Sequence, residues 1–438
     1  MRILGSVFRR AFKFLAKKPE TLFKIQQGWL KFGYAYLDLT AASWVIRRPE
    51  WLMVKSQAKV TKLEPELPAE THPNTDIAVR IIKRYQALNA VAGSFQELIP
   101  EKSMWGVLRL EHYRELCQLV ESGDVELLAR RYTKIFRTDA VNGYSYGTTF
   151  NSEPFRWAYL PIGIELSVVT LAEHIGILRA ETHEQGKIAY WRLVFTEEQL
   201  MDRIEEHFGF RVEAPRFGDP RGIMFGGRFL SRETCSHLYT ALRMREIIDR
   251  QGVVEPLRIV EIGGGYGGTC YWLRKLMGTR IARYAIVDLP EVSLVQSYFL
   301  GSAVAESLVL DGESISGVAS PIQLVPHFEL EKIDFQPNIL INQDSMPEMP
   351  ESEVDRYLSW GSRSLKGLFI SFNQEAYSPW AGTLQVHVPT MAARYPHYRR
   401  VSRETSWDRR GYVEEAYVVN DLGMHRVLGA AAVDASDF

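Results

Sequence analysis

The sequence predicts an α/β protein whose C-terminal half is a doubly wound, mostly parallel sheet, preceded by a mainly helical N-terminal region. Two observations predict this fold. From Leu257 onward, short runs of β-branched and aromatic residues alternate with helical patterns, as they do in βαβ units. Before Arg250, apolar residues recur at steps of three to four, which is typical of amphipathic helices.

Length and composition limit the classes of protein. The chain has 438 residues, 46% of them hydrophobic, which is enough for two cores. The net charge of −1 does not favour nucleic-acid binding. Three cysteines far apart exclude a disulfide framework and favour the cytoplasm. We expect a helical, amphipathic segment and linker over 1–74, a helical cap or oligomerisation region over 75–228, and a cofactor-binding domain over 229–438.

The first 18 residues form a basic, amphipathic pattern. Apolar residues from Leu4 to Leu15 share one face at helical spacing, and arginines and lysines flank it. Such a helix suits peripheral contact with anionic lipid at the inner face of the membrane. It equally suits packing on the protein itself or on a second subunit, so both a membrane contact and a homo-oligomer are expectations.

Segments that contain proline and glycine divide the N-terminal half. Residues 1–60 read as helical, and a Pro- and Glu-rich linker follows over 64–73. Helical patterns occupy 75–137 and 164–179, with a polar loop over 142–149 between them. The glycines and prolines of 215–228 predict an irregular boundary loop, after which Ser231 would cap a helix that ends near Arg250.

The C-terminal half alternates strands and helices. The predicted strands are 257–262, 284–288, 322–325, 338–342 and 367–372, and the helices between them are 271–277, 292–299 and 354–364. Residues 412–420 would add a late antiparallel strand.

A glycine-rich turn, Glu261 to Gly268, follows the first of these strands. Glycines let a ligand approach the backbone closely, and the next helix presents free N–H groups there. Gly263, Gly265 and Gly268 match the spacing of dinucleotide-binding turns, so NAD(P) is an alternative ligand. However, Glu261 would repel a pyrophosphate and suits an ammonium group. Asp288, at the tip of the second strand, can accept ribose hydroxyls of either ligand.

The segments VEIGGGYGG (260–268) and YAIVDLPEV (284–292) resemble the class I S-adenosylmethionine-dependent methyltransferases, which have a Rossmann-like sheet. Residues 338–350, 372–375 and 410–415 resemble the bacterial sugar O-methyltransferase family associated with surface-polysaccharide gene clusters. The resemblance covers about 215–420.

The resemblance implies a role for each matching residue. Glu261 would hold the methionine ammonium, directly or through water, and Asp288 would bind the ribose hydroxyls. Leu289 would pack on the adenine. The glycines that would shape the turn are Gly263, Gly265 and Gly267. Past the fourth strand, the residues that would line the methyl-transfer site are Asn342, Gln343 and Asp344, the first two as part of the cofactor site.

Methyl transfer to a hydroxyl needs a group that takes the hydroxyl proton. His387 is a candidate general base or a hydrogen-bonded loop histidine. Asp344 and Glu348 follow the fourth strand, where open α/β sheets bind ligands. Either could be the base, both could hold Mg²⁺, or Glu348 could simply cap the next helix. Arg409 suits a phosphate or carboxylate on the acceptor, or a solvated charge pair.

The sequence therefore predicts an S-adenosylmethionine-dependent O-methyltransferase. The resemblance implies a sugar hydroxyl as the acceptor, in surface-polysaccharide or glycoconjugate biosynthesis. The alternatives are a methyltransferase for a non-sugar small molecule, a non-catalytic scaffold that keeps a cofactor fold, and an NAD-dependent oxidoreductase.

Overall fold

The structure is a computed structural model that describes residues 73–91, 112–141, 154–180, 191–375, 385–409 and 411–420. The helical pattern of 1–60, the proposed membrane contact of residues 1–18 and the loop over 142–149 lie outside these residues. Among the described helices, none is both long enough and apolar enough to cross a membrane.

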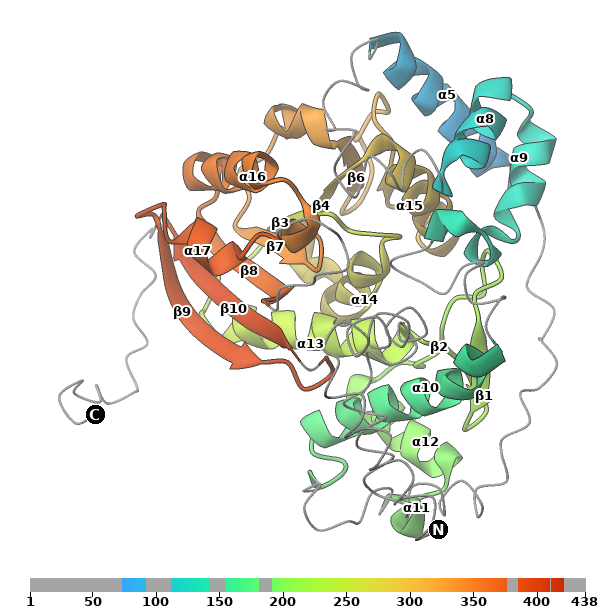
Figure 1. The fold of residues 1–438 in the computed structure, drawn as a ribbon, viewed down its shortest axis with the longest axis vertical. Coiled ribbons are helices and arrows are strands. Elements are labelled where there is room, and N and C mark those ends of the chain that lie inside the picture. The colour runs from blue at the N-terminus through green and yellow to red at the C-terminus, as the bar shows by residue number, and fades with distance from the viewer. Residues whose placement is uncertain are drawn as a thin grey trace, which may run out of the picture.

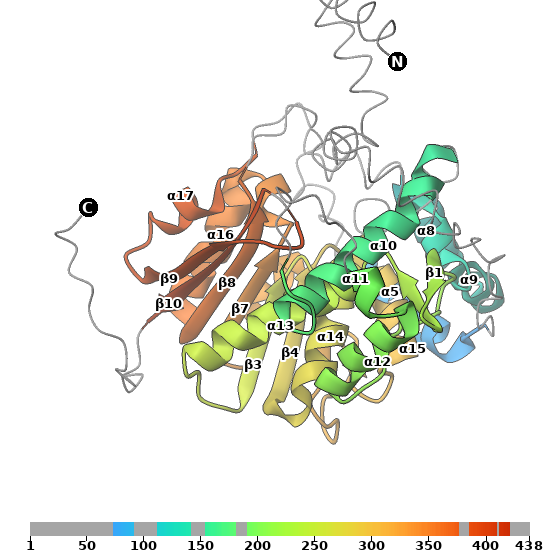
Figure 2. The same cartoon turned by 90° about the horizontal axis from the view of Figure 1, so that it is seen from below.

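An eight-stranded sheet forms the centre of the C-terminal half, in the order β5-β6-β4-β3-β7-β8-β10-β9 (Figures 1 and 2). Its strands are β3 (Leu257–Ile262), β4 (Ile281–Asp288), β5 (Leu308–Val309), β6 (Ile322–Pro326), β7 (Ile339–Gln343), β8 (Gly367–Gln374), β9 (Tyr398–Thr405) and β10 (Tyr412–Val419). All pairings among β3, β4, β5, β6, β7 and β8 are parallel, whereas β10 runs antiparallel to β8 and to β9.

This arrangement confirms the predicted Rossmann-like, doubly wound sheet with a late antiparallel strand. The predicted strand at 257–262 coincides with β3, and the other predicted strands each fall on an observed one. Two strands were not predicted. β5 has only two residues, and half of the eight β9 positions carry charged, exposed side chains, so neither shows a strong apolar pattern.

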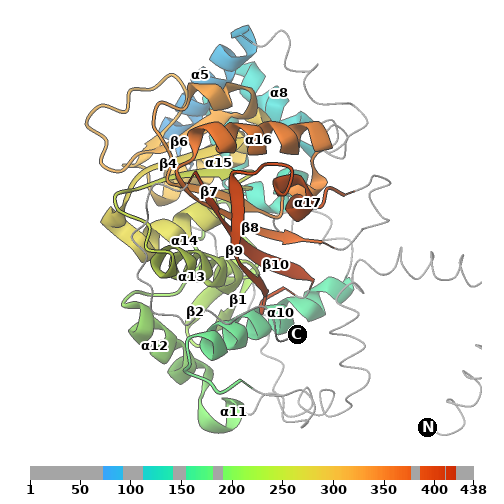
Figure 3. The same ribbon diagram turned by 90° about the vertical axis from the view of Figure 1, so that its left-hand side faces the viewer.

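The two faces of the sheet are covered by different helices, because successive side chains of a strand point to opposite faces. Ile259 and Ile341 belong to a buried cluster with α13 (Thr234–Arg250), α14 (Gly268–Met277) and α15 (Pro290–Ala303). Val260 and Leu340 belong to a second cluster with α16 (Glu351–Ser364) and α17 (Val388–Ala392). Figure 3 shows α13 and α14 on one side of the strands and α16 on another.

Several helices precede α13 in the described part of the chain. They are α5 (Thr75–Val91), α8 (Arg114–Ser122), α9 (Val125–Tyr132), α10 (Pro154–His174), α11 (Trp191–Val194) and α12 (Glu197–Phe208). Helix α5 contacts α15, and α10 contacts α13 (Figure 1). Buried residues of both regions share one cluster. The boundaries at 74 and 228 remain predictions.

The prediction of an irregular loop over 215–228 is wrong in part. β1 (Gly222–Phe225) and β2 (Arg228–Ser231) pair as an antiparallel hairpin around Gly226 and Gly227, both at positive φ. The glycines therefore form a hairpin turn. Ser231 ends β2, and its N–H donates to the Thr234 hydroxyl at 2.8 Å, so it does not cap α13 as we expected.

Candidate active site

The carboxyl ends of β3, β4, β7 and β8 meet at one edge of the sheet. Ile262 pairs with Val287 on one side and with Asn342 on the other, and Asn342 pairs with Ser371 of β8. The residues that follow these strands are therefore neighbours, although they are far apart in the sequence. Ligands bind at this edge of open α/β sheets.

The glycine-rich turn connects β3 to α14 at this edge. Gly263, Gly265 and Gly267 have φ of 71°, 56° and 94°, a region that side chains rarely adopt. A Cβ at Gly263 would also lie 2.1 Å from the Ser345 hydroxyl oxygen. Residues 263–265 stay partly exposed, so a ligand can reach their backbone.

Glu261 lies beneath this turn at the end of β3. Its side chain is buried, and one carboxylate oxygen accepts a hydrogen bond of 2.8 Å from the Tyr284 hydroxyl. Burial raises the pKa of Glu261 to about 7, the Tyr284 hydrogen bond opposes this, and the charge of Asp288 adds to it. Glu261 can thus change its charge near neutral pH when a cation approaches.

Asp288 ends β4 beside the same turn. One carboxylate oxygen accepts the Leu289 N–H at 2.8 Å, and the other accepts the Gln296 amide at 2.7 Å. Burial raises the pKa of Asp288 to about 7, and hydrogen bonds from Leu289, Gln296 and the backbone of Gly265 and Gly264 oppose the rise. The carboxylate is thereby fixed against the turn. The Leu289 side chain is partly buried against the core cluster.

Asn342 and Gln343 hold the edge together. Asn342 is fully buried, and its amide nitrogen donates to the Ile262 carbonyl at 2.9 Å and to the Ser345 hydroxyl at 2.7 Å. Its oxygen accepts from Asn373 at 2.9 Å. The Gln343 oxygen accepts from the Thr269 hydroxyl at 2.8 Å. As the structure stands, Asn342 joins three strands, and its contact with a cofactor remains a prediction.

Asp344 lies at the tip of β7 with a φ of 68°, which is unusual for a residue with a side chain. Its carboxylate accepts hydrogen bonds from Arg409 and, at 2.6 Å, from the Tyr412 hydroxyl. The Arg409 guanidinium also lies 3.7 Å from the centre of the Tyr412 ring. Arg409 is therefore paired at this edge, although 37% of its side chain is exposed.

Glu348 is the next acid along this loop. Within the described residues, no hydrogen bond or ion pair of its side chain occurs. Burial raises the pKa of Glu348 to about 8, the charge of Asp344 adds to the rise, and Arg409 opposes it. Glu348 does not cap α16, because the N-cap residue of that helix is Pro350 and no side chain caps it.

His387 reaches this edge only through its neighbours. Its Nδ1 is 2.7 Å from the Thr390 hydroxyl, and its Nε2 is 3.3 Å from a carboxylate oxygen of Glu375. The side chain is 45% exposed, and the adjacent Val386 N–H donates to the Pro347 carbonyl. A role for His387 as general base remains a prediction.

His237 is a site residue that sequence reasoning missed. It belongs to α13, and its Nδ1 lies 3.1 Å from the Tyr266 hydroxyl of the turn. Burial lowers the pKa of His237 to about 4, Arg409 and Arg232 lower it further, and Asp344 opposes them. The imidazole is therefore neutral at physiological pH. A Cβ at Gly268 would lie 2.2 Å from its Nδ1, so this glycine gives the ring its place.

The acids at this edge do not fit a Mg²⁺ site. Asp344 is already paired with Arg409, and that guanidinium lies where its charge also acts on Glu348. Within the described residues, no group of three or more His, Cys, Asp or Glu side chains could hold a metal ion.

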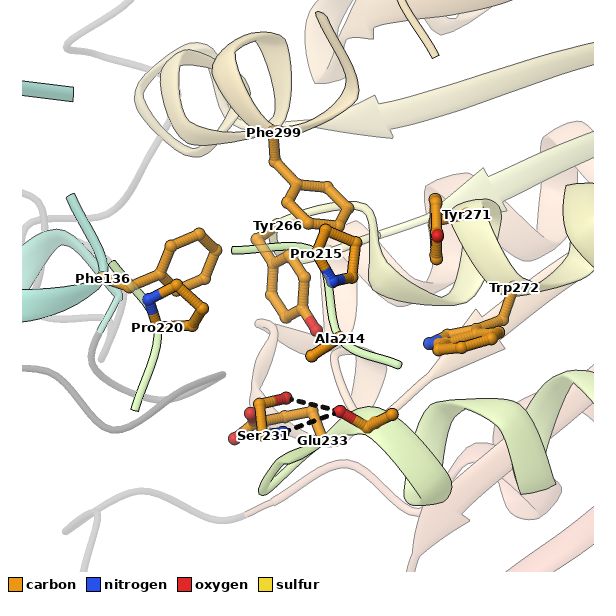
Figure 4. Close-up of a pocket in the computed structure, with 11 residues that line it drawn as sticks. Phe136, Ala214, Pro215, Pro220, Ser231, Glu233, Tyr266, Tyr271, Trp272 and Phe299 are labelled. Carbon is orange, nitrogen blue, oxygen red and sulfur yellow. Dashed lines mark hydrogen bonds between the residues drawn. The ribbon is translucent and has the colours of Figure 1, made fainter. Parts of the chain in front are cut away.

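A small, partly open pocket lies on the α13–α15 side of Tyr266 (Figure 4). Eleven residues line it: Phe136, Ala214, Pro215, Pro220, Ser231, Glu233, Thr234, Tyr266, Tyr271, Trp272 and Phe299. Five are aromatic, and Glu233 is the only charged one. Burial raises the pKa of Glu233 to about 7. Glu233 and His237 are one turn apart on α13, so Tyr266 borders both this pocket and the edge of the sheet.

No family model and no curated protein matches the chain. Solved methyltransferase-related structures are similar to part of it. The pyocyanin biosynthetic protein PhzM is 14% identical with a TM-score of 0.32, and the match covers 43% of this chain and 56% of that one. Magnesium protoporphyrin IX methyltransferase from Synechocystis PCC 6803, with bound SAM, is 14% identical with a TM-score of 0.30, over 41% of this chain and 77% of that one.

The glycopeptide N-methyltransferase MtfA, complexed with sinefungin, is 12% identical with a TM-score of 0.31, over 42% of this chain and 94% of that one. At such low TM-scores the likeness carries no weight for activity.

Proposed function

We propose that the chain is an S-adenosylmethionine-dependent O-methyltransferase. The observation that supports this most is the pair of acids, Glu261 and Asp288, on two sides of an accessible glycine turn. Both are buried enough to raise their pKa to about 7, and each raises the cost of a further negative charge nearby. A pyrophosphate is disfavoured there, whereas a donor with ammonium and sulfonium groups is favoured.

Each residue at this edge would bind a different part of the donor. Glu261 and the backbone of 263–265 would hold the methionine end of the donor, and Asp288 would accept its ribose hydroxyls. Leu289 would pack on the adenine. When bound, S-adenosylmethionine supplies a methyl group already activated by a sulfonium, so the protein has to orient the acceptor and take its proton.

His237 is the proton acceptor that this geometry favours. It is not held in an ion pair among the described residues, whereas Asp344 and His387 are paired with Arg409 and Glu375. In the tautomer in which His237 Nδ1–H donates to the Tyr266 oxygen, Nε2 would receive the proton of the acceptor hydroxyl. As the new O–CH₃ bond forms, the S–CH₃ bond breaks, and Arg409 and Tyr412 would position the acceptor oxygen.

A saccharide is the acceptor class that we propose. The resemblance of 338–350, 372–375 and 410–415 to sugar O-methyltransferases supports it, and so does the pocket beside Tyr266. The aromatic side chains around this small pocket offer apolar surface, and Glu233 offers a hydrogen-bond acceptor, to a small part of the acceptor such as one hydroxyl group. A non-sugar small molecule of similar amphipathic character is the alternative.

The test is calorimetric titration of the purified chain with S-adenosylmethionine, S-adenosylhomocysteine and NADH, each with and without Mg²⁺. Micromolar binding of the two methyl-cycle compounds, without binding of NADH, would support the proposal. A panel of nucleotide-sugars would then be assayed for methyl transfer. Binding of NADH alone would restore the oxidoreductase alternative, and binding of none would leave a non-catalytic scaffold.

A further inference from the structure

Glu348 differs from its acidic neighbours in having no partner for its side chain among the described residues. Glu261 accepts a hydrogen bond from Tyr284, Asp288 from Gln296, and Asp344 from Tyr412. Glu348 is partly buried. A carboxylate that loses part of its hydration without gaining a partner costs free energy, and a cation beside it recovers part of that cost.

The loop that carries Glu348 contacts the glycine turn through two of its other residues. A Cβ at Gly263 would lie 2.1 Å from the Ser345 hydroxyl oxygen and 3.6 Å from the Met349 Cε. Glu348 lies between Ser345 and Met349, at the end of the short helix η7 (Met346–Glu348). The loop that carries it therefore rests on the first glycine of the turn, where the reactive end of the donor would come nearest to β7.

We infer that Glu348 is the counter-ion of the donor's sulfonium group, and that it makes the site prefer S-adenosylmethionine over uncharged S-adenosylhomocysteine. This inference rests on the proposed function. The sulfonium charge exists before methyl transfer and is absent afterwards, so the counter-ion would attract the substrate form and release the product form.

Binding of the sulfonium should be coupled to a proton. The groups that face Glu348 are Asp344, which favours its protonated form, and Arg409 and Tyr412. Below its raised pKa, the free protein keeps Glu348 protonated, and an approaching cation lowers that pKa and expels the proton. The affinity for S-adenosylmethionine should therefore rise with pH until Glu348 is ionised in the free protein, and the affinity for S-adenosylhomocysteine should lack this component.

The experiment compares both ligands by calorimetry on the full chain, in two buffers of different ionisation enthalpy. The variants are Glu348→Gln and, as a matched control, Glu351→Gln, whose carboxylate is exposed and paired with Arg394. We expect wild type and control to bind S-adenosylmethionine about tenfold more tightly than S-adenosylhomocysteine, with proton release. Glu348→Gln should bind both alike, with its S-adenosylhomocysteine affinity unchanged and without that proton release.

The other outcomes separate the two hypotheses. If wild type binds the two ligands equally, or if Glu348→Gln weakens both to the same extent while its melting temperature is retained, the counter-ion role is overturned and the proposed function stands. If wild type binds neither ligand, the proposed function itself fails. Should Glu348→Gln not fold, Glu348→Asp is the alternative variant, because it keeps the carboxylate on a side chain one methylene shorter. Loss of the preference for S-adenosylmethionine in Glu348→Asp would support the role.

Discussion

The Tyr412 hydroxyl donates a hydrogen bond of 2.6 Å to the Asp344 carboxylate, across 68 residues of sequence. Tyr412 begins β10, and Asp344 follows the end of β7. The two meet because β10 is antiparallel to the other central strands, which brings its first residues to the edge where parallel strands end. The late reversed strand therefore supplies Tyr412 to the site, and the bend before it supplies Arg409.

Within this cluster, the charge of Asp344 influences the pKa of Glu348. Asp344→Asn should lower the pKa of Glu348 from about 8, because the charge of Asp344 now raises it. Carbon-13 NMR of protein labelled at glutamate carboxyl groups would measure the shift, with Glu348→Gln to assign the signal. Asp355→Asn, which changes a carboxylate bound to Tyr395 instead, is the control. An unchanged titration in Asp344→Asn would contradict this coupling.

Much of the sheet and half of the site could be predicted from sequence because both depend on local patterns. The run Leu257 to Ile262 is apolar and β-rich, and the turn after it has glycines where φ is positive. Asp288 ends the next apolar run. Each is a feature of a few consecutive residues, and the carboxyl ends of parallel strands must share one edge.

The remaining site residues could not be predicted because tertiary packing alone assembles them. His237 lies within α13 with no motif around it, and it joins the site through Tyr266 and the gap at Gly268. From the sequence, Arg409 could be interpreted as a solvated charge, because its partner Asp344 is 65 residues away. The hairpin over 222–231 could not be predicted, because glycines are equally common in hairpin turns and in irregular loops.

The ribose assignment of Asp288 is open to a direct test. Asp288→Asn keeps the size of the side chain but removes the charge that accepts two hydroxyl donors. We expect about tenfold to hundredfold weaker binding of both S-adenosylmethionine and S-adenosylhomocysteine, by calorimetry. Asp334→Asn, in an exposed pair with Arg283, is the control. Equal affinity in Asp288→Asn and wild type would mean that the ribose lies elsewhere.

The turn glycines should differ in their tolerance of a side chain. Gly263→Ala has both a positive φ and a Cβ that would meet Ser345, whereas Gly252→Ala has a φ of 61° with nothing within 4 Å. Gly252→Ala should therefore lower the free energy of unfolding by about 1 kcal/mol, and Gly263→Ala by about 2–4 kcal/mol. Urea unfolding measures both. Equal losses would show that Ser345 moves aside at no cost.

Glu348 should also make the ligand-free protein less stable in alkaline solution. Its pKa is about 8 in the folded chain, against an ordinary value near 4.5. Below the ordinary value both states are protonated, and the folded state has its full stability. Between the two values only the folded state keeps the proton, so the free energy of unfolding falls as the pH rises, until Glu348 ionises in the folded protein as well.

Glu348→Gln lacks this titration. As the pH rises, the free energy of unfolding of the variant should therefore increase relative to that of wild type. We expect a gain of about 2 kcal/mol between about pH 5 and about pH 9, allowing for the part of the side chain that water still reaches. Urea unfolding at both pH values measures it. Glu261 and Asp288 titrate in both proteins and cancel in the difference. A difference that stays constant with pH would mean that Glu348 is already well solvated, and it would remove the free-energy cost that a sulfonium is expected to relieve.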